Sequence, residues 1–107
     1  MIASKGIELF AGSPSPSRES ALSLLGAVAD PVRWTVLRRL SAGQACVCDL
    51  QVEVPVALNL LSYHLKVLRE AGLVTTSRRG RWVDYRLADG AFVRLTEALP
   101  VPDRERK

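Results

Sequence analysis

Cys46 and Cys48, which are separated by one residue, are the candidate ligands for a soft metal ion in this 107-residue chain. As thiolates they can bind arsenite, antimonite, cadmium, zinc, mercury or copper(I), and as a dithiol they can be oxidised. Side chains two residues apart on a helix diverge by about 200°, so clasping one ion would require partial unwinding of the first turn. The alternative is that both cysteines are small buried hydrophobic residues.

A second set of candidate binding residues lies along Val56–Gly72, a segment whose periodicity predicts an amphipathic helix. Its apolar sector contains Leu58, Leu61, Leu65 and Leu68, extended by Leu60 and Val67. Its polar sector contains Asn59, Ser62, Tyr63, Lys66, Arg69 and Glu70. Short hydrogen-bonding side chains mixed with cations suit the base edges and phosphates of a major groove. This face is therefore a candidate DNA-reading surface.

The basic residues concentrate at the end of this helix and in the segment after it. Residues 66–86 contain six cations against two acids, an excess equal to the net charge of +4 of the whole chain. Such a patch indicates a polyanionic partner. Arg78, Arg79 and Arg81 are expected on one turn, from which they would reach phosphates or the minor groove. A membrane-binding segment would carry exposed Trp, Phe or Leu beside its cations, so we expect double-stranded DNA and no membrane.

Hydrophobic periodicity and capping residues indicate the elements that position these side chains. We expect helices at Glu19–Ala29, at Pro31–Leu40 with Asp30 as N-cap, at Cys46–Glu53, at Val56–Ala71 and at Asp89–Leu99. Leu73–Ser77 and the alternating Arg81–Leu87 predict a two-stranded hairpin whose turn is Arg78-Arg79-Gly80. The order of these elements predicts an α+β, mostly helical, winged helix-turn-helix with a two-stranded wing and flanking dimerisation helices.

Within the second strand of the expected wing, the alternation assigns side chains to two faces. Val83, Tyr85 and Leu87 are expected on one face, and Trp82, Asp84 and Arg86 on the other.

The domain organisation follows from the same pattern. We expect a flexible N-terminal arm at 1–18, a DNA-binding domain at 19–99 and a charged tail at 100–107. The first and last helices keep apolar faces that a small core does not cover, which predicts a two-fold homodimer on palindromic DNA. No apolar run is long enough to cross a membrane and the start of the chain lacks a signal-peptide layout, so we expect a cytoplasmic protein.

The chain also lacks the residue sets that most enzymes need. It has one histidine, no paired carboxylates in a cleft pattern, no Gly-rich phosphate loop and no nucleophile motif. We therefore do not expect an enzyme.

Four segments occur in a distinctive order along the chain. They are Ala27-Val-Ala-Asp-Pro-Val-Arg33, Cys46-Val-Cys-Asp-Leu50, Ser62-Tyr-His-Leu-Lys-Val-Leu-Arg-Glu-Ala-Gly-Leu-Val74 and Gly80-Arg-Trp-Val-Asp-Tyr-Arg-Leu87. Together, over roughly residues 20–99, they closely resemble the ArsR–SmtB family of bacterial metal-responsive repressors. The resemblance implies a winged-helix homodimer that represses an operator and releases it when an effector binds.

The resemblance also implies roles for individual residues. It identifies Leu58–Ala71 as the recognition helix, with Ser62 and His64 matching the family's Ser-x-His-Leu signature, and Cys46–Leu50 as its cysteine box. In a helical projection His64 lies on the flank of the apolar side, so a hydrogen-bonded core-edge histidine and a DNA contact both remain open. The candidate DNA contacts are Asn59, Ser62, Tyr63, His64, Lys66, Arg78, Arg79 and Arg81.

The cysteine box departs from that family pattern. Arsenite-type sensors of the family typically use a third cysteine, in one version three residues after the second, where this chain has Gln51. The family's other metal site, on the last helix, uses His and acidic residues, and Asp89-Gly90-Ala91 with no histidine after it does not match. Cys46 and Cys48 are thus an incomplete ligand set for tetrahedral zinc or trigonal arsenic.

Three alternatives remain for the effector. The first is a thiophilic metal or metalloid ion on Cys46 and Cys48, completed by a small thiol, water or a carboxylate such as Asp49. The second is a dithiol redox switch. The third is a regulator that binds elsewhere, such as a partner protein. A winged-helix module that binds protein instead of DNA is the competing function, and it would carry an acidic or neutral recognition face and a wing without arginines.

Overall fold

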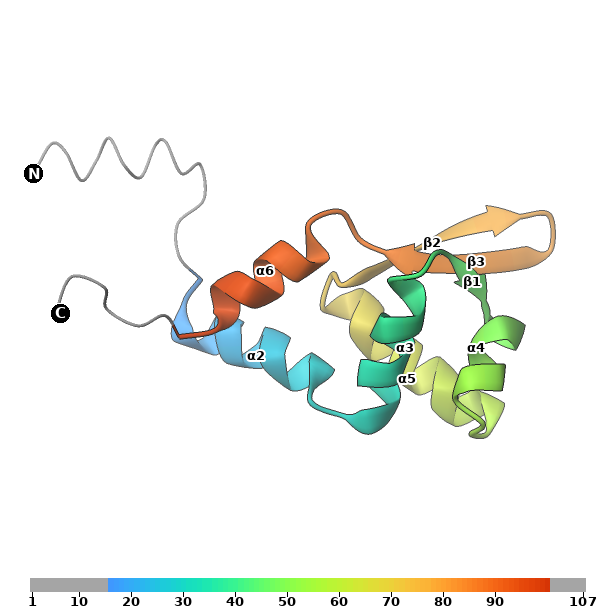
Figure 1. Ribbon diagram of the computed structural model, residues 1–107, viewed down its shortest axis with the longest axis horizontal. Coiled ribbons are helices and arrows are strands. Elements are labelled where there is room, and N and C mark those ends of the chain that lie inside the picture. The colour runs from blue at the N-terminus through green and yellow to red at the C-terminus, as the bar shows by residue number, and fades with distance from the viewer. Residues whose placement is uncertain (1–15, 101–107) are drawn as a thin grey trace, which may run out of the picture.

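The computed structural model describes residues 16–100, which form five helices and one antiparallel sheet (Figure 1). In chain order the elements are α2 (Arg18–Val28), α3 (Pro31–Leu40), β1 (Ala45–Cys46), α4 (Val47–Glu53), α5 (Leu58–Glu70), β2 (Val74–Arg79), β3 (Trp82–Leu87) and α6 (Ala91–Ala98). The α+β class and the expected helices are confirmed, with ends that shift by one or two residues. The expected arm and tail fall largely on residues 1–15 and 101–107, which lie outside the described residues.

The break between α2 and α3 forms as its residues predict. The Asp30 carboxylate accepts hydrogen bonds from the backbone N–H groups of Val32 (2.8 Å) and Arg33 (3.1 Å), and Pro31 is the first helical residue. An N-cap acceptor followed by Pro satisfies the free donors of the first turn, so the second helix begins at a defined residue.

Helices α4 and α5 form the helix-turn-helix, and α5 is the central helix of the core. Helix α4 ends before Pro55, and the Gln51 side chain donates to the carbonyl of Val56 (3.1 Å) across the turn. Helix α5 begins at Leu58 and ends before Gly72, whose φ of +75° allows the Leu73 N–H to bond back to the Leu68 carbonyl (3.0 Å). The side chains of α5 that are fully buried are Leu61, Leu65 and Leu68.

The sheet differs from the expected hairpin by one additional strand. Its order is β1-β3-β2, and the short β1 pairs Ala45 with Tyr85 and Cys46 with Asp84. Cys46 therefore belongs to a strand and is the N-cap residue of α4, whose first residue is Val47. This corrects the expectation of a helix starting at Cys46. A two-residue strand has no periodicity of its own, so only its pairing with β3 reveals it.

The hairpin turn also begins and ends later in the chain than predicted. Strand β2 extends through Arg79, which pairs with Trp82, so the turn consists of Gly80 and Arg81. Gly80 takes a φ of +62°, the left-handed conformation that tight hairpin turns require.

Helices α2 and α6 lie side by side at the end of the molecule opposite the wing (Figure 1). Leu22 on α2, Phe92 and Val93 on α6, and Leu99 directly after α6 are about half exposed, at 47–60% of their full surface. This exposed apolar set agrees with the expectation that the flanking helices leave part of their apolar faces uncovered. Within residues 16–100 no helix has both the length and the apolar character needed to span a membrane.

Candidate nucleic-acid interface and cysteine box

The predicted polar face of α5 is exposed over its whole length. Asn59, Ser62, Tyr63 and Lys66 are all exposed and follow a spacing of three, one and three residues, which places them on one stripe of the helix. Lys66 also approaches Glu70 at 3.9 Å, but both side chains are more than 60% exposed, so this ion pair is weak and leaves Lys66 available.

The apolar sector of α5 is narrower than predicted. Leu58 and Leu60 are 55% and 44% exposed, so they belong to the accessible start of the helix and not to the core. Both residues precede Leu61, the first leucine of α5 that the core covers.

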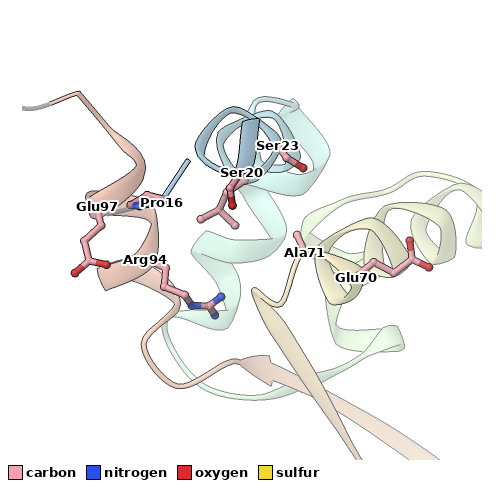
Figure 2. A pocket seen from close by; sticks show the side chains of 8 residues that line it. Pro16, Ser20, Ser23, Glu70, Ala71, Arg94 and Glu97 are labelled. Atoms are coloured by element: carbon pink, nitrogen blue, oxygen red, sulfur yellow. The ribbon is translucent and has the colours of Figure 1, made fainter. Parts of the chain in front are cut away.

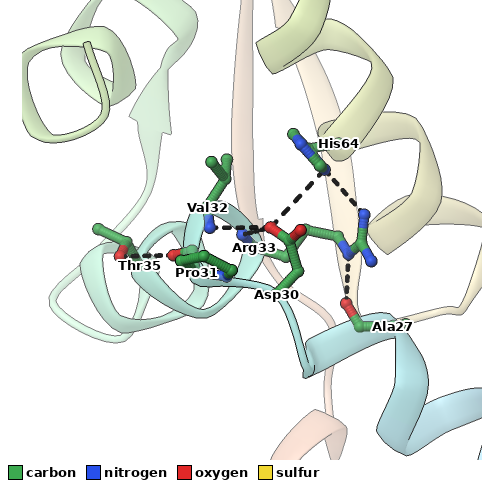
Figure 3. A network of polar contacts seen from close by, with 7 residues as sticks. All are labelled: Ala27, Asp30, Pro31, Val32, Arg33, Thr35 and His64. Carbon is green, nitrogen blue, oxygen red and sulfur yellow. Dashed lines mark hydrogen bonds and ion pairs between the residues drawn. The ribbon is translucent and has the colours of Figure 1, made fainter. Parts of the chain in front are cut away.

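His64 is buried, with 7% of its surface exposed, and is not on this exposed stripe. Its Nδ1 lies 2.8 Å from Nη1 of Arg33 and 4.0 Å from Oδ1 of Asp30 (Figure 3). Arginine can only donate, so Nδ1 accepts and the ring proton of neutral His64 resides on Nε2. This geometry corresponds to the core-edge alternative and corrects the inclusion of His64 among the DNA contacts.

We call Asp30, Arg33 and His64 the helix anchor, because they connect the start of α3 to the middle of α5. Arg33 also donates from Nε to the carbonyl of Ala27 (2.6 Å), so it ties the end of α2 to the same point. Desolvation raises the pKa of the Asp30 carboxyl. The backbone N–H groups of Arg33 and Val32 and the charge of the Arg33 guanidinium together lower it by a larger amount, so the net pKa is below its ordinary value.

The three wing arginines do not share one turn. Arg78 and Arg79 are successive residues of β2 and so point to opposite faces of the sheet, whereas Arg81 lies in the turn. All three are exposed. Arg79 differs from the other two because its Nε donates to Oδ2 of Asp84 (2.8 Å) and its Nη2 to Oδ1 (3.0 Å).

Asp84 is buried, with 4% of its surface exposed, although it shares its face of β3 with Trp82 and Arg86, which are exposed. Strand β3 is the central strand of the sheet, so Asp84 has cross-strand neighbours on both sides, Cys46 of β1 and Ser77 of β2. The hydrogen bonds from Arg79 are the main cause of the low pKa of Asp84, and they likewise raise the pKa of Arg79.

The cysteine box borders this ion pair. Cys46 is the cross-strand partner of Asp84, so their side chains share a face of the sheet. The Cys46 thiol donates to Oδ2 of Asp49 (3.3 Å), and the Cys46 N–H donates to the same oxygen (3.2 Å). The charge of Asp49 also contributes to the raised pKa of Arg79. We call Cys46, Asp49, Asp84 and Arg79 the wing-root cluster.

The two thiols have different environments. Cys46 is half-buried at the N-cap of α4, with an extended backbone (φ −85°, ψ 172°), whereas Cys48 is exposed in the first turn of the helix. Among residues 16–100, no three His, Cys, Asp or Glu side chains are arranged as a metal site. Gln51, three residues after Cys48, donates from its side chain to the Val56 carbonyl in the turn before α5.

A hollow with a volume of about 490 Å³ lies away from both regions (Figure 2). It is bordered by α2, the end of α5 and α6, and includes Ser20, Ser23, Glu70 and Glu97. Arg94 reaches across it to the carbonyl of Gly72. None of the residues that line the hollow belongs to the cysteine box.

Asp84 and Arg33 are the residues that sequence reasoning did not assign to a site. An acid between Val83 and Tyr85 in an alternating strand is a signal that could have identified Asp84, since hairpin register places Arg79 diagonally across from it. No local pattern connects Arg33 with His64, because 31 residues separate them.

Comparison with known proteins gives consistent matches to this arrangement. Residues 30–76 match the family described as bacterial regulatory protein, arsR family. The transcriptional repressor SmtB of Mycobacterium tuberculosis is 45% identical over 76 residues, which are 71% of this chain and 56% of SmtB. This chain therefore spans little more than half the length of that relative. The biofilm growth-associated repressor of Agrobacterium fabrum is 37% identical, with 80% of this chain and 77% of the repressor covered.

A solved structure shows the same fold. The homodimeric winged helix-turn-helix DNA-binding domain of a candidate ArsR-family regulator from Mycobacterium bovis superposes with a TM-score of 0.64 and 26% identity. The match covers 73% of this chain and 74% of that domain. The winged helix-turn-helix architecture expected from the sequence is confirmed.

Proposed function

The chain belongs to the ArsR–SmtB family of bacterial regulatory proteins, and on that premise we propose that it is a homodimeric transcriptional repressor of palindromic operator DNA in the cytoplasm. The family consists of transcriptional regulators and not of enzymes, in agreement with the sequence-based expectation. The remaining parts of the proposal are how DNA is bound, how the dimer forms and what releases it.

The observation that carries DNA binding is the exposed stripe of α5 beside a basic wing. Asn59, Ser62 and Tyr63 offer hydrogen-bonding groups for base edges, and Lys66 offers a cation for the backbone. Arg78 and Arg81 add exposed cations on the adjoining hairpin. A module that binds protein through this face would not need such a concentration of positive charge.

Fluorescence anisotropy with duplexes that contain or lack a palindrome tests this proposal across a range of salt concentrations. We expect log K to fall steeply with log salt, because each neutralised phosphate releases counterions. Arg81→Ala should weaken binding to all duplexes alike, whereas Tyr63→Ala should reduce the preference for the palindrome. Val52→Ala, on the exposed side of α4, is the control. Affinity that does not change with salt would support the protein-binding alternative.

We place the dimer interface on α2 and α6. Support comes from the exposed apolar residues there and from the homodimeric state of the mycobacterial domain. Phe92→Asp should convert the dimer to monomer in sedimentation velocity, because a charge would be buried in an apolar interface. Val52→Asp, at an apolar position on α4 that is 80% exposed, should leave the dimer intact.

We propose that a thiophilic metal or metalloid ion acts as the effector at Cys46 and Cys48. Cys46 already lies outside the helix with a carboxylate oxygen of Asp49 beside its sulfur, so only Cys48 must move to bring three donors together. Thiolate and carboxylate donors form a mixed site that favours soft or borderline ions. Redox control and a partner protein are the other outcomes of the test.

Titration of the reduced protein with Cd²⁺ distinguishes these three effectors. Direct binding predicts a thiolate-to-metal absorption band that grows in parallel with DNA release, and Cys46→Ser and Cys48→Ser should each abolish both signals. Release by the thiol oxidant diamide without release by Cd²⁺ would instead support the redox switch. A protein that responds to neither reagent would point to a partner protein.

A further inference from the structure

The Arg79–Asp84 ion pair differs from an ordinary surface ion pair in the exposure of its two members. The Asp84 side chain is 5% exposed, whereas the Arg79 side chain is 64% exposed. The carboxylate is therefore fixed within the sheet, and the guanidinium extends from it towards solvent. In the described residues no comparable side-chain bond holds Arg78 or Arg81.

The geometry of this pair leaves Arg79 able to bind a second anion. Asp84 occupies one edge of the guanidinium, through Nε and Nη2, and a guanidinium has five N–H donors in a planar fork. Three donors remain, and the bidentate contact fixes the plane in which they lie. A side chain already held in one conformation loses less entropy when it binds a phosphate oxygen.

We propose that Asp84 is a positioning residue for DNA binding, which holds Arg79 so that the free edge of its guanidinium binds a backbone phosphate. The inference rests on the proposed DNA-binding function, and it means that an acidic residue, Asp84, increases the affinity for DNA. Simple electrostatics predicts the reverse, since removing a negative charge from a DNA-binding surface should strengthen binding. The sign of the effect therefore distinguishes positioning from mere proximity.

Non-specific DNA binding provides the measurement, because phosphate contacts do not depend on sequence. The probe is a fluorescein-labelled duplex of mixed sequence, titrated with the dimeric protein at several salt concentrations. We expect Arg79→Ala to weaken binding by roughly tenfold and to reduce the salt slope by about one per subunit. Asp84→Asn, which keeps the size of the side chain, should weaken binding by about three- to tenfold.

The double variant shows whether Asp84 acts through Arg79. If Asp84 only positions Arg79, Asp84→Asn should cause no further loss in the Arg79→Ala protein. Asp89→Asn, which removes an exposed acid from the loop before α6, controls for net charge and should leave binding unchanged or slightly tighter. Circular dichroism of each variant verifies the fold.

Arg79→Lys gives a second test if Asp84→Asn does not fold. Lysine keeps the charge but cannot form the bidentate contact, so we expect most of the loss seen with Arg79→Ala. Unchanged or tighter binding by Asp84→Asn, an equal loss in both backgrounds, or full binding by Arg79→Lys would each overturn the inference. Wild-type protein that fails to bind the duplex would instead refute the proposed function itself.

Discussion

Recognition helix α5 and the wing, the two elements proposed to contact DNA, are joined to the rest of the molecule by different kinds of contact. Helix α5 is held by three leucines that are at most 1% exposed and by the helix anchor around buried His64. The wing is held by strand pairing and by the polar contacts of the wing-root cluster, which includes the thiol of Cys46. The position of α5 is thus determined mainly by packing, whereas that of the wing depends on groups that a chemical effector can change.

The largest expected effect on stability comes from the buried leucines of α5. Leu65→Ala should lower the free energy of unfolding by about 2–5 kcal/mol, because it removes buried methyl groups and leaves a cavity. Leu60→Ala, on the same helix but 44% exposed, should lower it by less than about 1 kcal/mol. Urea denaturation measures both. Similar losses for the two variants would mean that α5 is not anchored by its buried face.

The helix anchor should produce the next largest effect. Arg33→Ala removes the partner of His64 and the donor to the Ala27 carbonyl, so we expect a loss of about 1.5–3 kcal/mol in the free energy of unfolding. Arg38→Ala is the matched control on α3, since Arg38 is exposed and stacks on Trp34 at 5.6 Å. Its loss should not exceed about 1 kcal/mol. Equal losses would show that the anchor contributes no more than a surface contact.

One carboxylate from each region has a lowered pKa, which predicts a common pH dependence. The ionised forms of Asp30 and Asp84 stabilise the folded state at pH values above the unfolded pKa of about 3.9. That contribution disappears as the pH falls through the lower folded-state pKa. The stability difference between wild type and Asp30→Asn or Asp84→Asn should therefore be constant above about pH 5 and shrink below pH 4. Urea titrations at a series of pH values measure it, and a difference that persists at acid pH would contradict it.

The smallest expected effect concerns the exposed ion pair of α5. Glu70→Gln removes the partner of Lys66, with a change in unfolding free energy of at most about 0.5 kcal/mol. It should nevertheless tighten DNA binding slightly, because the change leaves Lys66 unpaired beside the duplex. A clear loss of stability, measured by thermal melting, would show that this surface contributes more to the fold than its exposure indicates.

The same contrast explains how much could be predicted from the sequence. The helices, the Asp30 cap and the polar stripe of α5 follow local rules of period and capping, and these predictions agree with the structure. The environment of His64 depends on Arg33, which lies far away in the sequence. The position of Asp84 beside Cys46 depends on β1, a strand of two residues that no periodicity reveals. Contacts made by distant residues therefore account for the two features of the site that local sequence patterns could not predict.

Because Cys46 pairs with Asp84 at the base of the wing, the proposed effector site is coupled to the proposed DNA-binding surface. Equilibrium coupling between two sites is reciprocal: a ligand on Cys46 that loosens DNA binding is itself bound less tightly when DNA is present. Operator DNA would then protect this cysteine from its own effector, and the free repressor would be the form that captures it. Sensing by such a protein depends on how much of it is off the DNA, and so on the number of operators in the cell as well as on the concentration of the effector.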